Sequence, residues 1–295
     1  MKADPLVAAP PWRYVDLPKL GTLEVRDSGP VDGLTDQPAV LLLHGWTASA
    51  DLNWCHTYGP LAKRARIVTW DQRGHGARGL RTGTTTRIED LADDAAAITR
   101  ALDIDRVVLV GYSMGGAVAQ ATWRRHSDLV VGLILGATAA RFAVDEQQRK
   151  DFSLIRRWVR PSRQLEAVGC GNLAWRAARW FSDRQAGGPA TTGDKAFDKW
   201  AWDEVRSGLL SRVLTVGHDL GGFDSTGWLG EIDVPHAVLV CTEDEIVPTV
   251  RQNELVDTLP SPSIYKMATD HTACVTRPDL FIPALIAALD EMAPV

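Results

Sequence analysis

Continuous apolar runs alternate with amphipathic stretches along most of the chain. Ile88, Leu91, Ala95, Ile98 and Leu102 recur at three- and four-residue spacing, which predicts an amphipathic helix. Strands that alternate with helices predict a mostly parallel sheet with helices on both faces. The runs themselves are rich in aliphatic and β-branched residues, as strands buried on both faces are, and cover residues 39–43, 67–70, 107–110, 129–135 and 236–240.

Shorter patterns predict the remaining helices and strands of this α/β arrangement. Residues 14–17 and 22–27 flank Pro18 and Gly21, which predicts a first β-hairpin. Thr86 and Glu89 match a capping box at the start of the amphipathic helix. Further helices are expected over residues 53–64, from about residue 249, and at the C-terminus to about residue 291, with a last strand over residues 263–267.

The α/β rhythm stops after residue 140 and resumes only near residue 228. Three helices are expected between them, over residues 145–159, 164–181 and 195–216, and no run there is typical of a buried strand. We therefore expect a core domain of residues 1–139 and 228–295 with a helical cap inserted at residues 140–227. The cap also holds five tryptophans, which predict an apolar roof over a cleft: Trp158, Trp175, Trp180, Trp200 and Trp202.

Composition limits the classes of function. The 295 residues contain 45% hydrophobic residues, enough for a packed core. A net charge of −5 without a long single-sign run argues against a nucleic-acid or anionic-membrane partner, since either would need a basic patch. No signal peptide or spanning segment is visible, and four scattered cysteines are typical of reduced thiols. The expected location is cytoplasmic, without integral membrane association.

The run at residues 107–110 leads into Gly111-Tyr112-Ser113-Met114-Gly115-Gly116. A chain that turns from strand to helix within two residues holds Ser113 at a strained backbone angle. Gly111 and Gly115 leave room for the turn because they lack a Cβ. The Met114 N–H then lies where an oxyanion would form, at a helix N-terminus that favours negative charge. The pattern resembles the nucleophile elbow of α/β-hydrolases, with Ser113 as nucleophile.

A serine hydroxyl is a weak nucleophile that needs a base, and the base needs an orienting carboxylate. In the elbow architecture the chain order is serine, acid, histidine, each beyond a strand. His271 follows the last strand and is the expected base. Asp244, about three residues beyond the preceding strand, is the expected acid. Three other carboxylates remain as alternatives for this role: Glu243, Glu245 and Asp270.

His44-Gly45-Trp46 directly follows the run at residues 39–43. Gly45 permits a tight loop, so the backbone N–H of Trp46 is the expected second oxyanion donor beside that of Met114. The Trp46 side chain would then line the acyl pocket, with a place in the core as the alternative. The polar loop at residues 71–76 is interpreted as structural, although His75 could take part directly.

Taken together, His44-Gly45, the loop at residues 71–76, the elbow, Asp244 and His271 make the chain resemble an α/β-hydrolase-fold serine hydrolase of the capped esterase and lipase type. The resemblance covers about residues 20–140 and 228–290. It implies cleavage of a small-molecule carboxylic ester through an acyl-enzyme on Ser113, with no cofactor and no metal. The cap composition adds a preference for an apolar acyl part.

Other functions are compatible with the same residues. A cofactor-free perhydrolase and a hydrolase of carbon–carbon bonds share this triad, and a non-catalytic ligand-binding protein shares this fold. The sequence contains no His-Glu-x-x-His, no P-loop lysine and no Gly-x-Gly-x-x-Gly opening a helix, so no metalloprotease or nucleotide site is expected. The sequence leaves the physiological substrate and the oligomeric state open.

Overall fold

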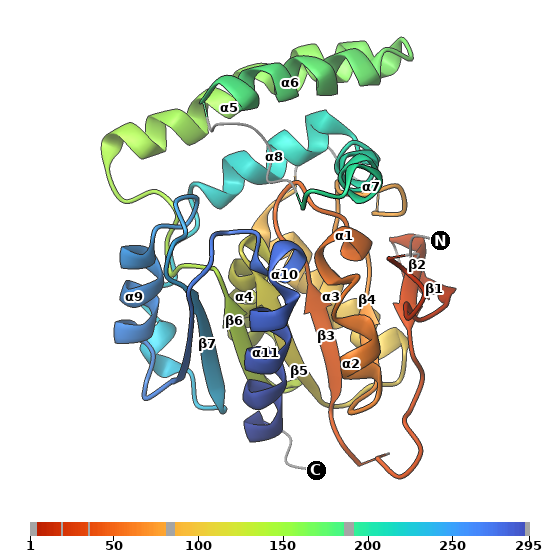
Figure 1. The fold of residues 1–295 in the computed structure, drawn as a ribbon, viewed down its shortest axis with the longest axis vertical. Helices are drawn as coiled ribbons and strands as arrows, with labels where there is room; N and C mark the ends of the chain where they lie inside the picture. Colours follow the sequence, from red (N-terminus) through yellow and green to blue (C-terminus); the bar gives the residue numbers. More distant parts are fainter. Residues whose placement is uncertain (1–4, 19, 35, 81–85, 186–191, 293–295) are drawn as a thin grey trace.

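The computed structural model describes residues 5–18, 20–34, 36–80, 86–185 and 192–292, without the side chains of residues 179–185. Its centre is an eight-stranded sheet (Figure 1) in the order β1-β2-β4-β3-β5-β6-β7-β8. The β1–β2 and β2–β4 pairs are antiparallel and all the others are parallel, as the sequence predicts. The strands in chain order are β1 (Trp12–Leu17), β2 (Gly21–Asp27), β3 (Ala39–Leu43), β4 (Ile67–Thr69), β5 (Val107–Tyr112), β6 (Val130–Gly136), β7 (His236–Cys241) and β8 (Ser263–Met267).

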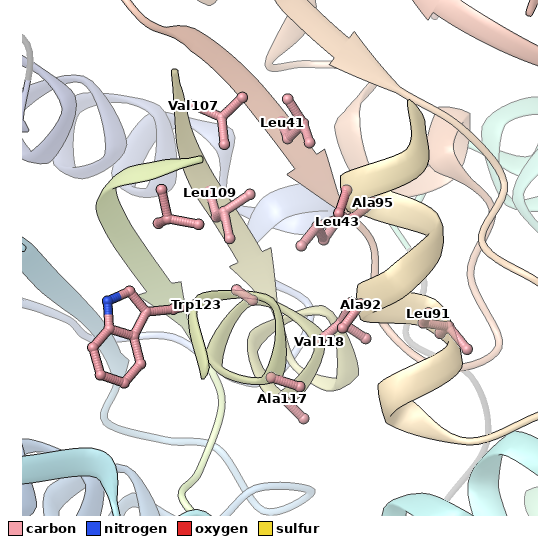
Figure 2. Close-up of a cluster of buried hydrophobic side chains, with 14 of the residues drawn as sticks. Leu41, Leu43, Leu91, Ala92, Ala95, Val107, Leu109, Ala117, Val118 and Trp123 are labelled. Carbon is pink, nitrogen blue, oxygen red and sulfur yellow. The ribbon is translucent and has the colours of Figure 1, made fainter. Parts of the chain in front are cut away.

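Helices cover both faces of the sheet because alternate strand residues point to opposite sides. Leu41, Leu43, Val107 and Leu109 face α3 (Ile88–Ala101) and α4 (Met114–Arg125), as Figure 2 shows, and α9 (Thr249–Thr258) packs on the same side. The opposite face is covered by α1 (Ala50–Trp54), α2 (Tyr58–Ala62), α10 (Ala273–Thr276) and α11 (Pro278–Met292), and a 3₁₀ turn, η1 (Leu229–Glu231), precedes β7. Each face therefore has its own hydrophobic core.

Four helices between β6 and β7 form a cap above one edge of the sheet (Figure 1). They are α5 (Glu146–Ala167), α6 (Gly171–Gln185), α7 (Lys195–Val205) and α8 (Leu210–Leu220). In Figure 1, α8 lies between the core and the α5–α6 pair, and α7 lies beside it. The two ends of this segment lie side by side. Arg141 and Asp224 form an isolated antiparallel β-bridge through their backbones, and the Ser225 N–H donates to Ala140 O at 2.9 Å. The domain boundaries at residues 139/140 and 227/228 stay a prediction.

Helix boundaries in the cap differ from the predicted ones. α5 continues through Pro161, where the sequence suggested a break, because that residue lies on the exposed side of a helix that packs along α8. The predicted helix over residues 195–216 is instead two, α7 and α8. The break lies at Gly208, where an added Cβ would come within 3.0 Å of the Gly76 backbone nitrogen. Close contact with the core loop therefore ends α7.

Two helix starts in the core are also corrected. The predicted helix over residues 53–64 is divided into α1 and α2, and α1 starts earlier, with Ser49 Oγ accepting from the Leu52 N–H at 3.1 Å. The capping box predicted from Thr86 and Glu89 is replaced by one half of such a box, one residue later, because the N-cap is Arg87, whose side chain cannot accept a hydrogen bond. Asp90 accepts from the Arg87 N–H at 2.9 Å, and Asp219 of α8 accepts from the Ile88 N–H at 2.8 Å. Asp219, a residue of the inserted cap segment, thus supplies the acceptor for a free N–H in the first turn of α3.

Candidate active site

Ser113 lies at the turn from β5 to α4 with a φ of 53° and a ψ of −119°. A residue with a side chain rarely adopts a positive φ, so the surrounding structure has to hold the backbone of Ser113 in this conformation. The Ser113 N–H donates to Gly136 O at 2.9 Å, and Thr138 Oγ1 donates to Ser113 O at 2.7 Å. Both bonds come from the end of neighbouring β6, so the sheet itself holds the strained turn.

Two glycines make the turn sterically possible. A Cβ on Gly111 would come within 2.3 Å of Gly115 O, and a Cβ on Gly115 would come within 2.0 Å of Leu43 O. Both distances are far below van der Waals contact, and both involve backbone atoms that cannot move aside. The predicted reason for glycine on either side of Ser113 therefore agrees with the packing.

The three residues expected to form a triad lie together beyond the ends of β5, β7 and β8. His271 Nε2 is 3.0 Å from Ser113 Oγ, and His271 Nδ1 is 2.7 Å from Asp244 Oδ2. In the tautomer that donates from Nδ1 to the Asp244 carboxylate, the Nε2 lone pair faces the hydroxyl. This is the tautomer that can accept a proton from Ser113 Oγ.

Asp244 is held by bonds from the segment that follows it. Its Oδ1 accepts from the N–H groups of Ile246 at 2.9 Å and Val247 at 2.8 Å, and its Oδ2 also accepts from Gln252 Nε2 at 3.0 Å. The alternatives lie elsewhere: Glu243 and Glu245 are exposed, and Asp270 accepts from the N–H and hydroxyl of Thr272 in a turn. Asp244 alone of these four reaches His271.

Sequence reasoning missed residues that position this trio. Gln252 links the end of β7 to the loop that follows it. Its side-chain amide also accepts from the Cys241 N–H at 2.9 Å and donates to Val247 O at 2.8 Å. Tyr112 OH donates to His271 O at 2.9 Å and its ring lies 5.9 Å from the imidazole. A glutamine in a helix and a tyrosine at a strand end carry no local signal of such a role. Only the tertiary structure identifies them.

The loop after β3 lies beside the elbow because Leu43 pairs with Gly111. A Cβ on Gly45 would lie 3.4 Å from Ser113 Cβ, and the Gly45 N–H donates to Asn53 Oδ1 at 2.9 Å. Trp46, next to Gly45, lines the same cavity as Ser113, and Met114 is the first residue of α4. Their role as oxyanion donors stays a prediction.

His44 supports this loop as a neutral side chain. It is fully buried, with Nδ1 2.8 Å from Gly45 O and Nε2 accepting from the Gln72 N–H at 2.8 Å. Burial lowers the pKa of His44 to about 3, with a smaller contribution from the neighbouring His75. Burial likewise lowers the pKa of His75 to about 4. His75 does not line the cavity described below, so it fits the structural interpretation of its loop.

A cavity of about 340 Å³ opens beside Ser113 and His271. The core contributes Trp46, Leu52, Tyr112 and Ile246, among others, to its wall. The cap contributes mainly α7, through Phe197, Asp198, Ala201, Trp202 and Val205. Most of these side chains are apolar, and Asp198 is the one acidic side chain among the described lining residues. The cavity can take a small, largely apolar group up to the serine.

Trp46 lies between the cavity and the cap. Its ring contributes to the cavity wall, as the sequence predicts, while Nε1 donates to Val213 O of α8 at 2.8 Å. A Cβ on Gly217 would come within 2.3 Å of the same ring. Trp46 therefore also fixes α8 on the core.

The five cap tryptophans do not act alike. Trp202 lines the cavity, and Trp175 supports it edge-on at 6.4 Å while donating to Gly208 O. Trp200 packs against Phe197, whereas Trp158 is 54% exposed. The Trp180 side chain lies outside the described residues. The apolar roof of the cavity is therefore formed mainly by side chains of α7, and Trp202 is the one cap tryptophan that lines it in the described chain.

The described part of the chain contains neither a metal-binding cluster nor a membrane-spanning helix. In the described ranges, no group of three or more His, Cys, Asp or Glu side chains could hold a metal ion. The helices there include none that is both long and apolar enough to cross a bilayer. The four cysteines are free thiols; Cys55, Cys241 and Cys274 are buried, and burial raises the pKa of Cys55 and of Cys241 to about 12.

Comparisons with known proteins agree with this fold. A sequence model of the alpha/beta hydrolase family matches residues 40–285. "Putative carbamate hydrolase RutD" of Agrobacterium fabrum is 28% identical over 261 residues, which cover 88% of this chain and 96% of the relative. "Pimeloyl-[acyl-carrier protein] methyl ester esterase" of Chromobacterium violaceum is 26% identical over 89% of this chain and 98% of its own. The solved structure of a thermophilic esterase from Thermogutta terrifontis superposes with a TM-score of 0.73, at 24% identity over 96% of this chain and 99% of its own.

Proposed function

The chain belongs to the alpha/beta hydrolase family, and on that premise we propose that it is a serine hydrolase that cleaves a carboxylic ester through an acyl-enzyme on Ser113. One observation carries the proposal. Ser113 Oγ, His271 and Asp244 form an unbroken chain of contacts at 3.0 Å and 2.7 Å, and the serine end of that chain opens on an apolar cavity. Nucleophile, base and orienting acid are thus within hydrogen-bond reach.

In the first step His271 Nε2 takes the hydroxyl proton as Ser113 Oγ bonds to the carbonyl carbon of the ester. The carbonyl oxygen becomes an oxyanion, which the N–H groups of Trp46 and Met114 stabilise together with the N-terminus of α4. Asp244 holds the imidazolium that forms. The oxyanion then collapses, the C–O bond to the alcohol breaks, and His271 returns the proton to the leaving oxygen.

The second step releases the acyl group. Water gives a proton to His271 Nε2 as its oxygen bonds to the acyl carbon. When this second oxyanion collapses, the bond from the acyl carbon to Ser113 Oγ breaks, His271 returns the proton to Ser113 Oγ, and a carboxylic acid is released. The cavity wall of Phe197, Ala201, Trp202 and Val205 supports an apolar acyl part. Each buried methylene would contribute up to about 0.8 kcal/mol until the cavity is full.

Two measurements test the proposal. A fluorophosphonate probe should add one covalent adduct, located by peptide mass spectrometry on Ser113 and absent from Ser113→Ala. With p-nitrophenyl esters of rising chain length, kcat/KM should climb and then level off, and Trp202→Ala should reduce the gain for medium chains by about fivefold while changing acetate little. An unlabelled protein, or acetate as the best ester with loss at every added carbon, would contradict it.

The same panel separates the neighbouring chemistries. One relative is named as a carbamate hydrolase, so an aryl carbamate matched to the best ester belongs in the panel. A vinylogous diketone tests cleavage of a carbon–carbon bond, and acetate with hydrogen peroxide tests perhydrolysis. Faster turnover of any of these than of the best ester would assign the triad to that reaction instead.

A further inference from the structure

The outer pair of cap helices differs in charge from the rest of the molecule. Residues 146–185 contain nine arginines or lysines and four acidic residues, although the whole chain has a net charge of −5. In Figure 1 these helices, α5 and α6, lie on the side of the cap farthest from the sheet. α5 is exposed over most of its circumference, and Ser162 is its one buried residue. We call this surface the outer hairpin.

Five arginines of the outer hairpin, all in its described part, are not neutralised by neighbouring carboxylates. Arg156, Arg157, Arg160, Arg163 and Arg176 make no ion pair with any residue in the described part of the chain. Elsewhere, surface arginines are paired: Arg124 contacts Glu231, and Arg125 contacts Asp93 at 2.8 Å. Unpaired cations grouped on one surface leave a positive potential there despite the negative net charge.

Apolar side chains are also exposed on the outer hairpin. Trp158 is 54% exposed and Leu154, one turn before it on α5, is 42% exposed. At the turn between the helices and on α6, Val168 is 71% and Leu173 51% exposed. Four of the nine large hydrophobic side chains that are exposed in the described chain thus lie on the outer hairpin. Exposing them to water is unfavourable unless another apolar phase covers them.

We propose that the outer hairpin is a docking surface for an anionic lipid bilayer. Arginines attract lipid phosphates, while tryptophan and aliphatic side chains enter the boundary between headgroups and acyl chains. The combination favours lipid over nucleic acid, since a phosphate backbone would use the arginines but would not cover Leu154, Val168 and Leu173. The protein would lie on the membrane surface through one helical pair, without a spanning segment.

This docking surface is separate from the proposed catalytic machinery. None of Arg157, Arg160, Leu154 or Trp158 lines the cavity beside Ser113. α8 lies between the outer hairpin and the core, and it is the helix that Trp46 fixes in place. Binding to lipid and hydrolysis of a soluble ester can therefore be measured independently, and Ser113→Ala should bind vesicles as the wild type does.

Vesicle flotation tests the proposal directly. The whole chain should bind vesicles of phosphatidylcholine with about 30% phosphatidylglycerol at low salt, and bind pure phosphatidylcholine at least about tenfold more weakly. About 0.5 M salt should reduce the binding strongly because it shortens the screening length. Arg157→Glu with Arg160→Glu should weaken binding to anionic vesicles by at least about tenfold, and Trp158→Ala should weaken it by about threefold or more at either salt.

The matched control reverses two lysines on the core. Lys63→Glu with Lys266→Glu changes the net charge equally, and both lysines are exposed and unpaired in the described structure. This variant should keep binding within about twofold, because its charges lie outside the docking surface. Circular dichroism and hydrolysis of a short soluble ester verify that every variant is folded.

Three results would overturn the proposal. They are no binding to anionic vesicles at low salt, equal losses for the hairpin and control variants, and binding of duplex DNA at a salt concentration where anionic vesicles are not bound. The last result would make the outer hairpin a nucleic-acid surface instead.

Discussion

The core and the cap use their charged side chains in opposite ways. In the core, buried charges are paired or multiply hydrogen-bonded: Arg26 grips Asp51 through two bonds at 2.5 and 2.8 Å, and Asp71 accepts from the backbone of Ala50 and Arg78. On α5 of the cap, arginines stand exposed without partners in the described chain. Buried charges in the core thus fix one geometry, whereas these arginines of α5 face the surroundings.

The difference suggests that the two regions have different functions. Ser113, His271 and Asp244 all come from loops that follow core strands, so the core carries the proposed chemistry. The cap supplies α7 to the cavity wall and the outer hairpin to the surface. Changes in the core should therefore alter turnover of every substrate. Changes in the cap should alter which substrate is favoured and where the protein binds.

The largest expected effect is at the nucleophile. Ser113→Ala should lower kcat for all esters by about 10⁴-fold or more, because no other group can form the acyl-enzyme. The matched cap change is Ser153→Ala, since Ser153 Oγ donates only to Lys150 O within its own helix. That variant should stay within about twofold of wild type. Steady-state kinetics on purified proteins measures both, and turnover by Ser113→Ala within about tenfold of wild type would refute the assignment.

The next effect concerns the acid. Asp244→Asn should lower kcat by about 10²–10⁴-fold with the fold intact, because an amide can stabilise the wrong imidazole tautomer. Glu243→Gln changes an exposed carboxylate next to it and should have a mild effect. Far-ultraviolet circular dichroism verifies that both variants are folded. If Glu243→Gln is the damaging change, the acid has been assigned to the wrong position.

Much of the core is predictable because its signals are local. A β-branched run predicts a strand, and parallel strands place their C-terminal loops along one edge of the sheet. Ser113, Asp244 and His271 each lie within a few residues of such an end, so proximity follows from topology alone. The supporting bonds of Gln252 and Tyr112 are not predictable in this way, since their partners come from other segments.

The cap is less predictable because its helices depend on tertiary contacts. The break between α7 and α8 contains Gly208, which approaches residues 74–76 of the core, and no local sequence window contains both segments. The net charge of −5 also hid the basic outer hairpin, because an average over the chain says nothing about where charges gather. The argument against an anionic-membrane partner used that average and the lack of a long single-sign run, and neither describes how charges gather on a folded surface.

The loss of folding stability in acid should depend on a buried histidine of the core rather than on the cap. Burial lowers the pKa of His75 to about 4 from 6.5, so between these values the unfolded chain binds a proton that the folded chain does not. The stability from this site is complete above pH 6.5 and is lost as pH falls toward 4. In urea unfolding, wild type should lose about 2 kcal/mol more than His75→Asn between about pH 7 and pH 4.5. Equal losses would show that His75 is protonated in the folded protein.

The smallest expected effect is on selectivity, through a cap carboxylate. Asp198 lines the cavity, and no lysine or arginine is found among the described residues of its wall. The Asp198 Oδ1 atom accepts from the N–H and the hydroxyl of Thr192 at 2.9 and 2.8 Å, which keeps the side chain in place. A negative charge at the wall disfavours an acyl group that carries its own carboxylate.

Asp198→Asn removes this charge while its amide oxygen can still accept from Thr192. We expect kcat/KM for a p-nitrophenyl ester with a terminal carboxylate to rise by about fivefold relative to its neutral methyl ester, which corresponds to about 1 kcal/mol of repulsion. Asp203→Asn, on the same helix but outside the cavity wall, is the matched control and should leave that ratio unchanged. Because the cap is proposed to act on selectivity, kcat for the neutral ester should also stay near wild type. A fall in kcat for both esters would instead assign Asp198 to the chemical step and break the division between core and cap.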